Sequence, residues 1–183
     1  MKQSLRIIPF FLGLFLFIEG FLSPASARTE NTNKEVLVLN SINFNLPWAK
    51  NFYWCLHDAF QKQGVSVKAE SLSVPALMNE MEANAVVTHL RQKYPEPPTA
   101  IVMIGDPGWI VCRELFDDVW KEVPVIVTNA RDRLPASLDI LLSHAPLTES
   151  NSVSAEEWRR EYNITSLKQH YYVKETVDLI YKL

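Results

Sequence analysis

Short apolar segments alternate with longer amphipathic ones between residue 35 and residue 128. The short segments are rich in β-branched residues and cover residues 35–40, 65–69, 100–104 and 123–128. The near-continuous apolar run at 35–40 is typical of a strand that is buried on both faces of a parallel sheet, whereas residues 65–69 alternate between apolar and polar as a strand does. The longer segments cover residues 48–63, 75–94 and 109–120, and their apolar residues recur at helical spacing. The alternation predicts an α/β fold with a parallel sheet and right-handed crossovers.

Glycine and proline mark the expected ends of these helices. Gly64 follows the first helix, where a left-handed residue commonly ends a helix. Pro75 suits the first turn of the second helix because proline lacks an amide hydrogen. The Pro-Glu-Pro-Pro segment at 95–98 then ends that helix. We expect the strand order 2-1-3-4, with helices on both faces of the sheet.

The pattern weakens after Asn129. Residues 138–143 predict either a short strand or one helical turn, residues 144–157 a polar loop, and residues 162–165 another short strand. Apolar residues at helical spacing between 173 and 183 predict a closing helix. Such a helix normally leads to a further strand, so we expect residues 35–160 to form one α/β lobe. Residues 161–183 are then a crossover segment and helix that lead toward a second lobe, which is missing from the chain.

The first 27 residues have the features of a signal peptide. Lys2 and Arg6 precede an almost wholly apolar run at residues 7–18, and Pro-Ala-Ser-Ala at 24–27 provides a cleavage site. The run is shorter than the about 20 residues needed to cross a bilayer. We expect cleavage after Ala27, export of the chain, and a disordered polar segment at residues 28–34. Retention of the segment as an anchor is the alternative, because Glu19 lies close behind the apolar run.

Composition excludes several classes of protein. The chain of 183 residues is 48% hydrophobic and 21% charged, with a formal net charge of −3. This apolar content is too high for a disordered protein. The net charge does not favour a nucleic-acid partner, since such proteins neutralise phosphates with excess lysine and arginine.

Export permits disulfides, so the two cysteines require consideration. The expected strand order places the helix of Cys55 and the helix of Cys112 on opposite faces of the sheet. The sheet would then hold the sulfurs much farther apart than a disulfide allows. We expect two free, buried thiols.

Motifs for catalysis are absent from the sequence. It contains no phosphate-binding glycine loop and no Gly-x-Ser-x-Gly elbow. The four histidines lack ligand spacing with one another or with carboxylates, so no metal and no cofactor are expected. The charged residues at 156–161 are expected to form a solvated helical turn. A small exported hydrolase is the enzymatic alternative, although no nucleophile–base pair is visible.

A ligand of an open parallel sheet binds beyond the carboxyl ends of the strands, where the strand order reverses. Candidate ligand-binding residues therefore follow the first, third and fourth strands and combine polar groups with aromatic rings, which suits a small polar organic ligand. They are Ser41, Asn43, Trp48, Asp106, Trp109, Asn129 and Arg131. The alternative is structural: Asp106 opens an ordinary Asp-Pro-Gly turn, and Trp48 closes the base of its helix as a core residue.

Several of these segments together resemble one family. They are Val-Leu-Val-Leu-Asn-Ser at 36–41, Leu-Pro-Trp at 46–48, Ile-Val-Met-Ile-Gly-Asp-Pro-Gly-Trp at 101–109, Val-Pro-Val-Ile-Val at 123–127, and the segments 162–165 and 172–179. In these features the chain resembles the periplasmic-binding-protein-like sensor regions of bacterial sensor histidine kinases, which are related to the substrate-binding proteins of ABC transporters. It departs from them at residues 70–77, where Ser71 stands in place of an expected Lys or Arg after the acidic residue.

The resemblance implies a parallel-sheet, three-layer lobe of a type I periplasmic-binding-protein-like fold, with the second lobe missing. It implies a periplasmic, non-enzymatic module that senses a small polar organic ligand for a two-component system, while the parent protein would be the kinase. Self-association would occur through the parent receptor, and membrane attachment through C-terminal parts that this chain lacks. A substrate-binding protein of an ABC-type transporter is the alternative, and the sequence that follows Leu183 would distinguish the two.

Overall fold

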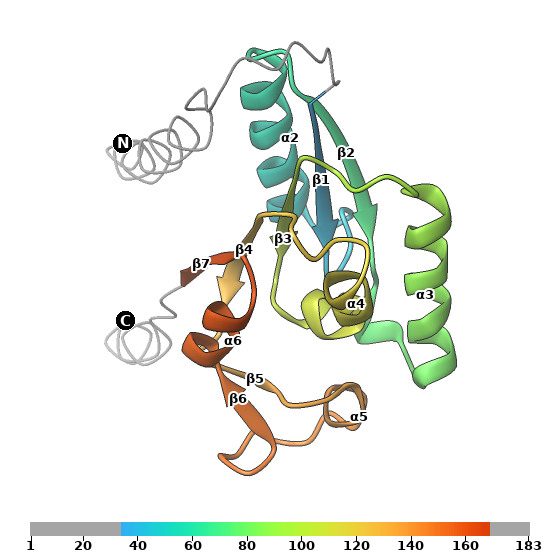
Figure 1. Cartoon of the computed structure of the whole chain (residues 1–183), viewed down its shortest axis with the longest axis vertical. Coiled ribbons are helices and arrows are strands. Elements are labelled where there is room, and N and C mark those ends of the chain that lie inside the picture. Colours follow the sequence, from blue (N-terminus) through green and yellow to red (C-terminus); the bar gives the residue numbers. More distant parts are fainter. Residues whose placement is uncertain (1–33, 169–183) are drawn as a thin grey trace, which may run out of the picture. The chain divides into compact units, whose positions relative to one another are not determined.

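The computed structural model describes residues 34–168, and their centre is a five-stranded parallel sheet (Figure 1). Its strands lie in the order β2-β1-β3-β4-β7. Their bounds are β1 Glu35–Asn40, β2 Ser66–Ser71, β3 Ala100–Ile104, β4 Val125–Ala130 and β7 Ile164–Lys168. The α/β fold class, the parallel sheet and the order of the first four strands are confirmed. This is the arrangement expected of one lobe of a type I periplasmic-binding-protein-like fold.

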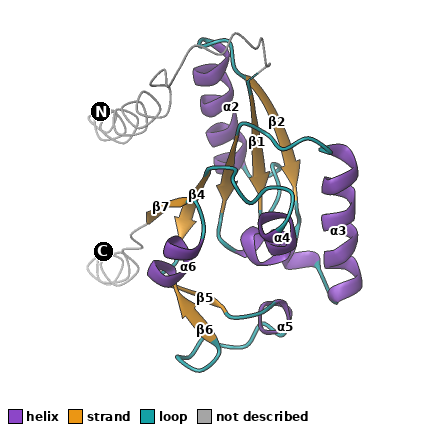
Figure 2. Ribbon diagram, viewed as in Figure 1, coloured by secondary structure: helices purple, strands orange, loops and turns teal. Residues whose placement is uncertain are grey.

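Helices cover both faces of the sheet (Figure 2). They are α2 Pro47–Gln61, α3 Glu80–Lys93, α4 Pro107–Asp117 and α6 Ala155–Glu161. Leu37 and Met103 point from the sheet into one core cluster with α3, α4 and α6, whereas the buried residues of α2 lie outside that cluster. The result is three layers, with α2 on one face and α3 and α4 on the other (Figure 1).

Aromatic rings join α4 to the C-terminal part of the described chain. Trp109 stacks on Phe116 with ring centroids 4.0 Å apart. It also makes edge contacts with Trp158 on α6 and with Tyr162, at centroid distances of 5.2 and 4.7 Å. Such pairs add to the large apolar area that each ring buries. They hold α6 and Tyr162, which follows it, against α4.

The second predicted helix begins later than expected. Pro75 belongs to a short 3-10 helix, η1 Val74–Ala76, which follows a turn at Ser73 with φ 51°. The α-helix α3 begins at Glu80, where the side chain of Asn79 accepts a hydrogen bond from the Glu82 amide at 3.0 Å. The prediction of a start near Pro75 is therefore wrong, because the asparagine cap sets the first turn.

The segment after β4 contains more regular structure than predicted. β5 Arg133–Pro135 pairs with β6 Ser152–Ser154 in a two-stranded antiparallel sheet, and α5 Leu138–Leu142 is a helical turn rather than a strand. The expected polar loop at 144–157 is wrong at its end. The side chain of Ser154 and that of Glu157 form a reciprocal capping box, and this starts α6 at Ala155. The charged residues at 156–161 do form a helix.

β7 completes the sheet beside β4. The short strand expected at 162–165 is present as Ile164–Lys168, parallel to β4 with Ile164 opposite Val125. The expected crossover segment at 161–183 therefore includes β7, a strand of this sheet. The predicted signal peptide at 1–27 and closing helix at 173–183 lie outside the described residues.

The cysteines are both free, as expected. Cys112 is fully buried within α4, but Cys55 is exposed, so the prediction that both thiols are buried is wrong for Cys55. The next residue, Leu56, faces the sheet and is 3% exposed. Cys55 is one helical step away and lies on the outer surface of α2.

Candidate functional site

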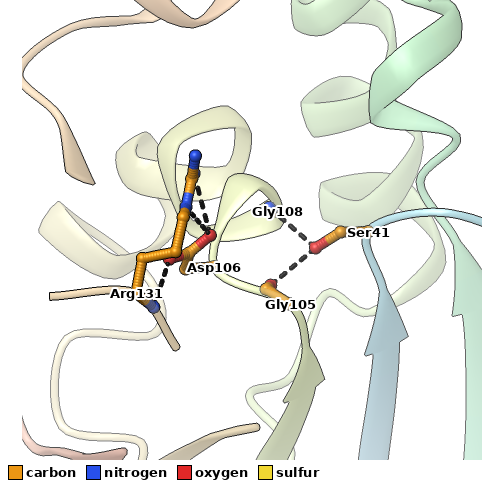
Figure 3. A network of polar contacts seen from close by, with 5 residues as sticks. All are labelled: Ser41, Gly105, Asp106, Gly108 and Arg131. Carbon is orange, nitrogen blue, oxygen red and sulfur yellow. Dashed lines mark hydrogen bonds and ion pairs between the residues drawn. The ribbon is translucent and has the colours of Figure 1, made fainter. Parts of the chain in front are cut away.

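Three of the predicted site residues meet at the carboxyl ends of neighbouring strands. Ser41 follows β1, Asp106 follows β3, and Arg131 follows β4. The strand order reverses between β1 and β3, because β2 lies on one side of β1 while β3 and β4 lie on the other. Figure 3 shows Ser41 between Gly105 and Gly108, and Asp106 facing Arg131. This is the position where open parallel sheets bind their ligands.

Ser41 fastens β1 to the start of α4. Its Oγ donates to the Gly105 carbonyl at 2.6 Å and accepts from the Gly108 amide at 2.8 Å. The second bond satisfies one of the amides at the helix N-terminus that have no partner within the helix. Ser41 is 1% exposed. Its hydroxyl is thus a structural connection and is not open to a ligand.

Glycines make this close approach possible. A Cβ on Gly108 would lie 2.7 Å from Ser41 Oγ and 2.8 Å from Leu72 Cδ1, which is too short for either contact. Gly105 adopts φ +85°, a left-handed conformation that glycine enters without steric cost. Sequence reasoning does not single out Gly108, although a glycine directly after Asp-Pro at a strand end is a signal for close packing.

Asp106 holds Arg131 through both its backbone and its side chain. The carboxylate accepts from the Arg131 backbone amide at 2.9 Å, from Nε at 3.0 Å to each oxygen, and from Nη2 at 2.9 Å. The Asp106 side chain is 2% exposed, whereas that of Arg131 is 43% exposed. A side-on ion pair of this kind fixes the plane of the guanidinium. The buried carboxylate also lies at the positive end of the α4 dipole, where negative charge is stabilised.

Arg131 is left with free donors on its outer side. Asp106 takes Nε and one side of Nη2. Within residues 34–168 no hydrogen bond or ion pair involves Nη1. The site therefore presents a fixed, half-exposed guanidinium edge beside the reversal of strand order, and this edge can bind an oxygen acceptor.

The other predicted site residues occupy different surroundings. Asn43 is partly buried, and its side chain accepts from the Asn45 amide at 2.9 Å in a local turn. Trp48 lies in the first turn of α2 and is 46% exposed, so the alternative of a core residue is wrong. Asn129 is partly buried with φ 57°. Trp109 is 2% exposed within the aromatic core, and the structure does not bring it to the surface of the site.

Comparison with known proteins gives no family for this chain. No family model matches the sequence, and no curated protein matches it. One solved structure with a similar fold is the Lac repressor dimer bound to operator and the anti-inducer ONPF. Its TM-score is 0.40, with 11% identity over 58% of this chain and 30% of the repressor chain.

A second similar structure is the Lac repressor bound to ONPG in the repressed state, with a TM-score of 0.39 and 10% identity. That match covers 75% of this chain and 40% of the repressor chain. The chain thus spans less than half the length of the repressor chains it resembles. Similarity of this degree assigns neither a family nor a function.

A second polar cluster joins β2 to α3. The Glu70 carboxylate, with 15% of its side chain exposed, accepts from the Tyr94 hydroxyl and from Lys93 Nζ, both at 2.6 Å. Burial alone would raise the pKa of Glu70, but the hydrogen bonds from Lys93 and Tyr94 outweigh it and lower that pKa. Burial, together with the bond to Glu70, raises the pKa of Tyr94. Glu70 thus ties the edge strand to the end of α3.

Two further features concern only the described part of the chain. Residues 34–168 contain no group of three or more His, Cys, Asp or Glu side chains that could hold a metal ion. None of the helices in that range is long and apolar enough to pass through a bilayer.

Proposed function

We propose that this chain is an exported lobe that recognises a small polar organic ligand at the carboxyl edge of its sheet. The observation that carries the proposal is the Arg131 guanidinium, which is fixed by a buried carboxylate and half exposed beside the reversal of strand order. Polar groups that converge at this position orient ligands in open α/β sheets. Trp48, exposed in the first turn of the neighbouring helix, supplies apolar area near the same edge.

A second arginine provides a comparison within the same molecule. The Arg91 side chain is also 43% exposed and also forms an ion pair, with Asp118 at 2.6 Å. Its partner is 59% exposed, however, whereas Asp106 is 2% exposed. Exposed pairs hold their geometry weakly, because solvent screens them and both side chains remain free to move. Of these two arginines, Arg131 is the one that a buried partner holds ready for a ligand.

The experiment compares these two arginines. The full chain, Arg131→Lys and Arg91→Lys would be screened against a panel of sugars, amino acids and organic acids by saturation-transfer-difference NMR, which detects weak binding. Arg131→Lys should lose the ligands that the wild-type chain binds, because lysine cannot reproduce the fixed edge of the guanidinium. Arg91→Lys should retain them. Equal binding by all three proteins would contradict the proposal, and thermal melts would check that each variant is folded.

Within this class we propose the sensing region of a two-component sensor histidine kinase. The support is the resemblance to such sensor regions, which lies in residues 36–41, 46–48, 101–109, 123–127, 162–165 and 172–179. A transport substrate-binding protein is the second candidate, on the same resemblance. Sequencing the gene beyond codon 183 separates them: a second lobe followed by a membrane helix and a kinase supports the sensor, and a second lobe followed by a stop codon supports the transport protein.

Export and the absence of catalysis are part of the proposal. Residues 1–27 should direct the chain across the membrane, so N-terminal sequencing of the exported protein should begin at Arg28. Recovery of the chain in the cytoplasm with Met1 in place would contradict this. Hydrolysis of ester or phosphate reporters that is lost in Asp106→Ala would contradict a non-enzymatic role.

A further inference from the structure

We propose that Asp106 makes the site at Arg131 selective for neutral ligands that carry oxygen acceptors, and disfavours carboxylates. This inference rests on the proposed function and specifies the ligand class of the same site. Asp106 is here a positioning and selectivity residue, and Arg131 is the residue that contacts the ligand.

The Asp106–Arg131 pair leaves donors to the ligand but no acceptor of its own. A guanidinium carries five N–H donors, and Asp106 takes the one on Nε and one on Nη2. The donors that remain are on Nη1 and on the outer side of Nη2. The Asp106 oxygens already accept from three Arg131 nitrogens and are 2% exposed, so the ligand cannot reach them. The site therefore selects a ligand hydroxyl or carbonyl oxygen.

The charge of the pair then decides between neutral and anionic acceptors. Asp106 and Arg131 carry opposite charges within 3.0 Å of each other, so the pair is neutral overall. A ligand carboxylate about 4 Å from the guanidinium would lie about 7 Å from Asp106, so repulsion cancels roughly half of the attraction. Because Asp106 is buried, solvent screens this repulsion less than it screens an exposed charge. A ligand carboxylate must also lose its hydration when it binds, and the remaining attraction to the guanidinium offsets little of that cost.

Arg133, a cation close to Arg131 in the sequence, does not add free positive charge beside the Arg131 guanidinium. Arg133 lies two residues after Arg131, but its Nε donates to Ser152 Oγ at 2.8 Å and its Nη2 to the Ser152 carbonyl at 3.1 Å. These bonds hold its guanidinium on the β5–β6 pair. The guanidinium edge of Arg131 therefore faces the ligand with the charge of Asp106 close behind it.

The test uses pairs of probes that differ in one carboxylate: galactose and galacturonate, glucose and glucuronate, glutamine and glutamate, asparagine and aspartate. Binding to the full chain is measured by saturation-transfer-difference NMR titration at about pH 7, where the acids are ionised. The wild-type chain should bind the neutral member of a pair roughly tenfold or more tightly. Asp106→Asn should shift that ratio toward the acid by about tenfold, because it removes the repelling charge.

The outcomes separate this inference from the proposed function. Tighter binding of the acidic members by the wild-type chain overturns the selectivity and leaves a ligand-binding lobe in place. An unchanged ratio in a folded Asp106→Asn variant overturns the role of Asp106. If Asp106→Asn does not fold, the ratio of neutral to acidic binding by the wild-type chain alone tests the selectivity. Failure of every probe to bind overturns the proposed function and this inference with it.

Discussion

Replacing Gly108 with alanine should destabilise the junction between β1 and α4. The new Cβ would lie 2.7 Å from Ser41 Oγ, 2.8 Å from Leu72 Cδ1 and 3.4 Å from Met103 Sδ. The Leu72 methyl group can rotate away, since it is the end of a flexible side chain. The Ser41 hydroxyl cannot move without giving up its bonds to the Gly105 carbonyl and the Gly108 amide.

The size of the effect follows from two opposing terms. Extra atoms forced into a packed site cost about 1–3 kcal/mol. Alanine regains up to about 1 kcal/mol in a helix interior, and less in the first turn, where Gly108 lies. We expect a net loss of about 1–2 kcal/mol. For a domain of this size that corresponds to a fall of roughly 2–8 °C in Tm.

Urea unfolding followed by tryptophan fluorescence measures the loss, because Trp109 and Trp120 are buried. Gly64→Ala is the matched control. Gly64 has φ +72°, and no atom lies within 4 Å of the position that its Cβ would take. Its alanine variant should therefore cost about 1–2 kcal/mol through backbone strain alone.

Ser41→Ala identifies the contact that causes the loss. Alone, it should cost about 1–3 kcal/mol, because it leaves the buried Gly108 amide without a partner. Combined with Gly108→Ala, it removes the colliding oxygen, so the double variant should be more stable than the two single effects predict by at least about 0.5 kcal/mol. Ser41→Ala and Gly64→Ala should combine additively. Additive effects of Ser41→Ala and Gly108→Ala, or a Gly108→Ala variant as stable as wild type, would refute the reasoning.

Three further variants or reactions test other parts of the described chain. Tyr94→Phe removes the 2.6 Å bond to Glu70 and should cost about 1–2 kcal/mol at neutral pH in urea unfolding. Because the pKa of Glu70 is lowered in the folded state, its stabilisation is present above its unfolded pKa and is lost in acid, so the difference from wild type should narrow below about pH 4. Burial raises the pKa of Cys112 to about 12, so a thiol reagent should label only the exposed Cys55 in the native chain and both cysteines after unfolding; native labelling of both would contradict the burial. Ser154→Ala removes the capping box of α6 and should cost about 1 kcal/mol, with a thermal melt as the measurement and Ser154→Asn, which can cap, as the control.

The sequence is sufficient for β1 and β3, the two strands whose apolar residues are buried on both faces. β1 and β3 begin and end where the apolar runs at 35–40 and 100–104 predict. Val36 to Leu39 are at most 5% exposed, and Ile101 to Ile104 at most 4%. None of these residues has a polar side chain that would favour exposure to solvent. The ends of the apolar run in the sequence therefore lie close to the ends of the buried strand.

Elements that depend on contacts distant in sequence are less predictable. β5 and β6 are three residues each and pair across residues 136–151, so neither carries a detectable period. Arg133, which bonds to Ser152, stabilises this pairing only once the two strands have met. The start of α3 also differs from prediction, because proline and asparagine are both signals of a helix start and only the folded chain shows which of them applies.

The position of the candidate site is predictable from the sequence, but which of its side chains face the site and which pack into the core is not. The rule for strand ends places Asp106 and Trp109 together after β3. They are three residues apart, yet Asp106 turns toward Arg131 while Trp109 turns into the core against Phe116. The direction of a side chain depends on the rotation of α4 about its axis, which is set by the packing of its apolar face on the sheet. A single sequence does not specify that rotation at its first turn.

The polar residues of this site are either buried or partly exposed, and substitutions at individual residues should have different effects. Ser41 and Asp106 are at most 1% exposed and have their hydrogen bonds satisfied within the chain, whereas the Arg131 side chain is 43% exposed and has donors to spare. A change at Ser41 should therefore lower stability without changing which ligands bind. A change at Asp106 should alter which ligands bind, because it changes the charge and orientation of a group that the ligand touches. A small shift of the carboxylate is enough for this, since the guanidinium takes its plane from Asp106.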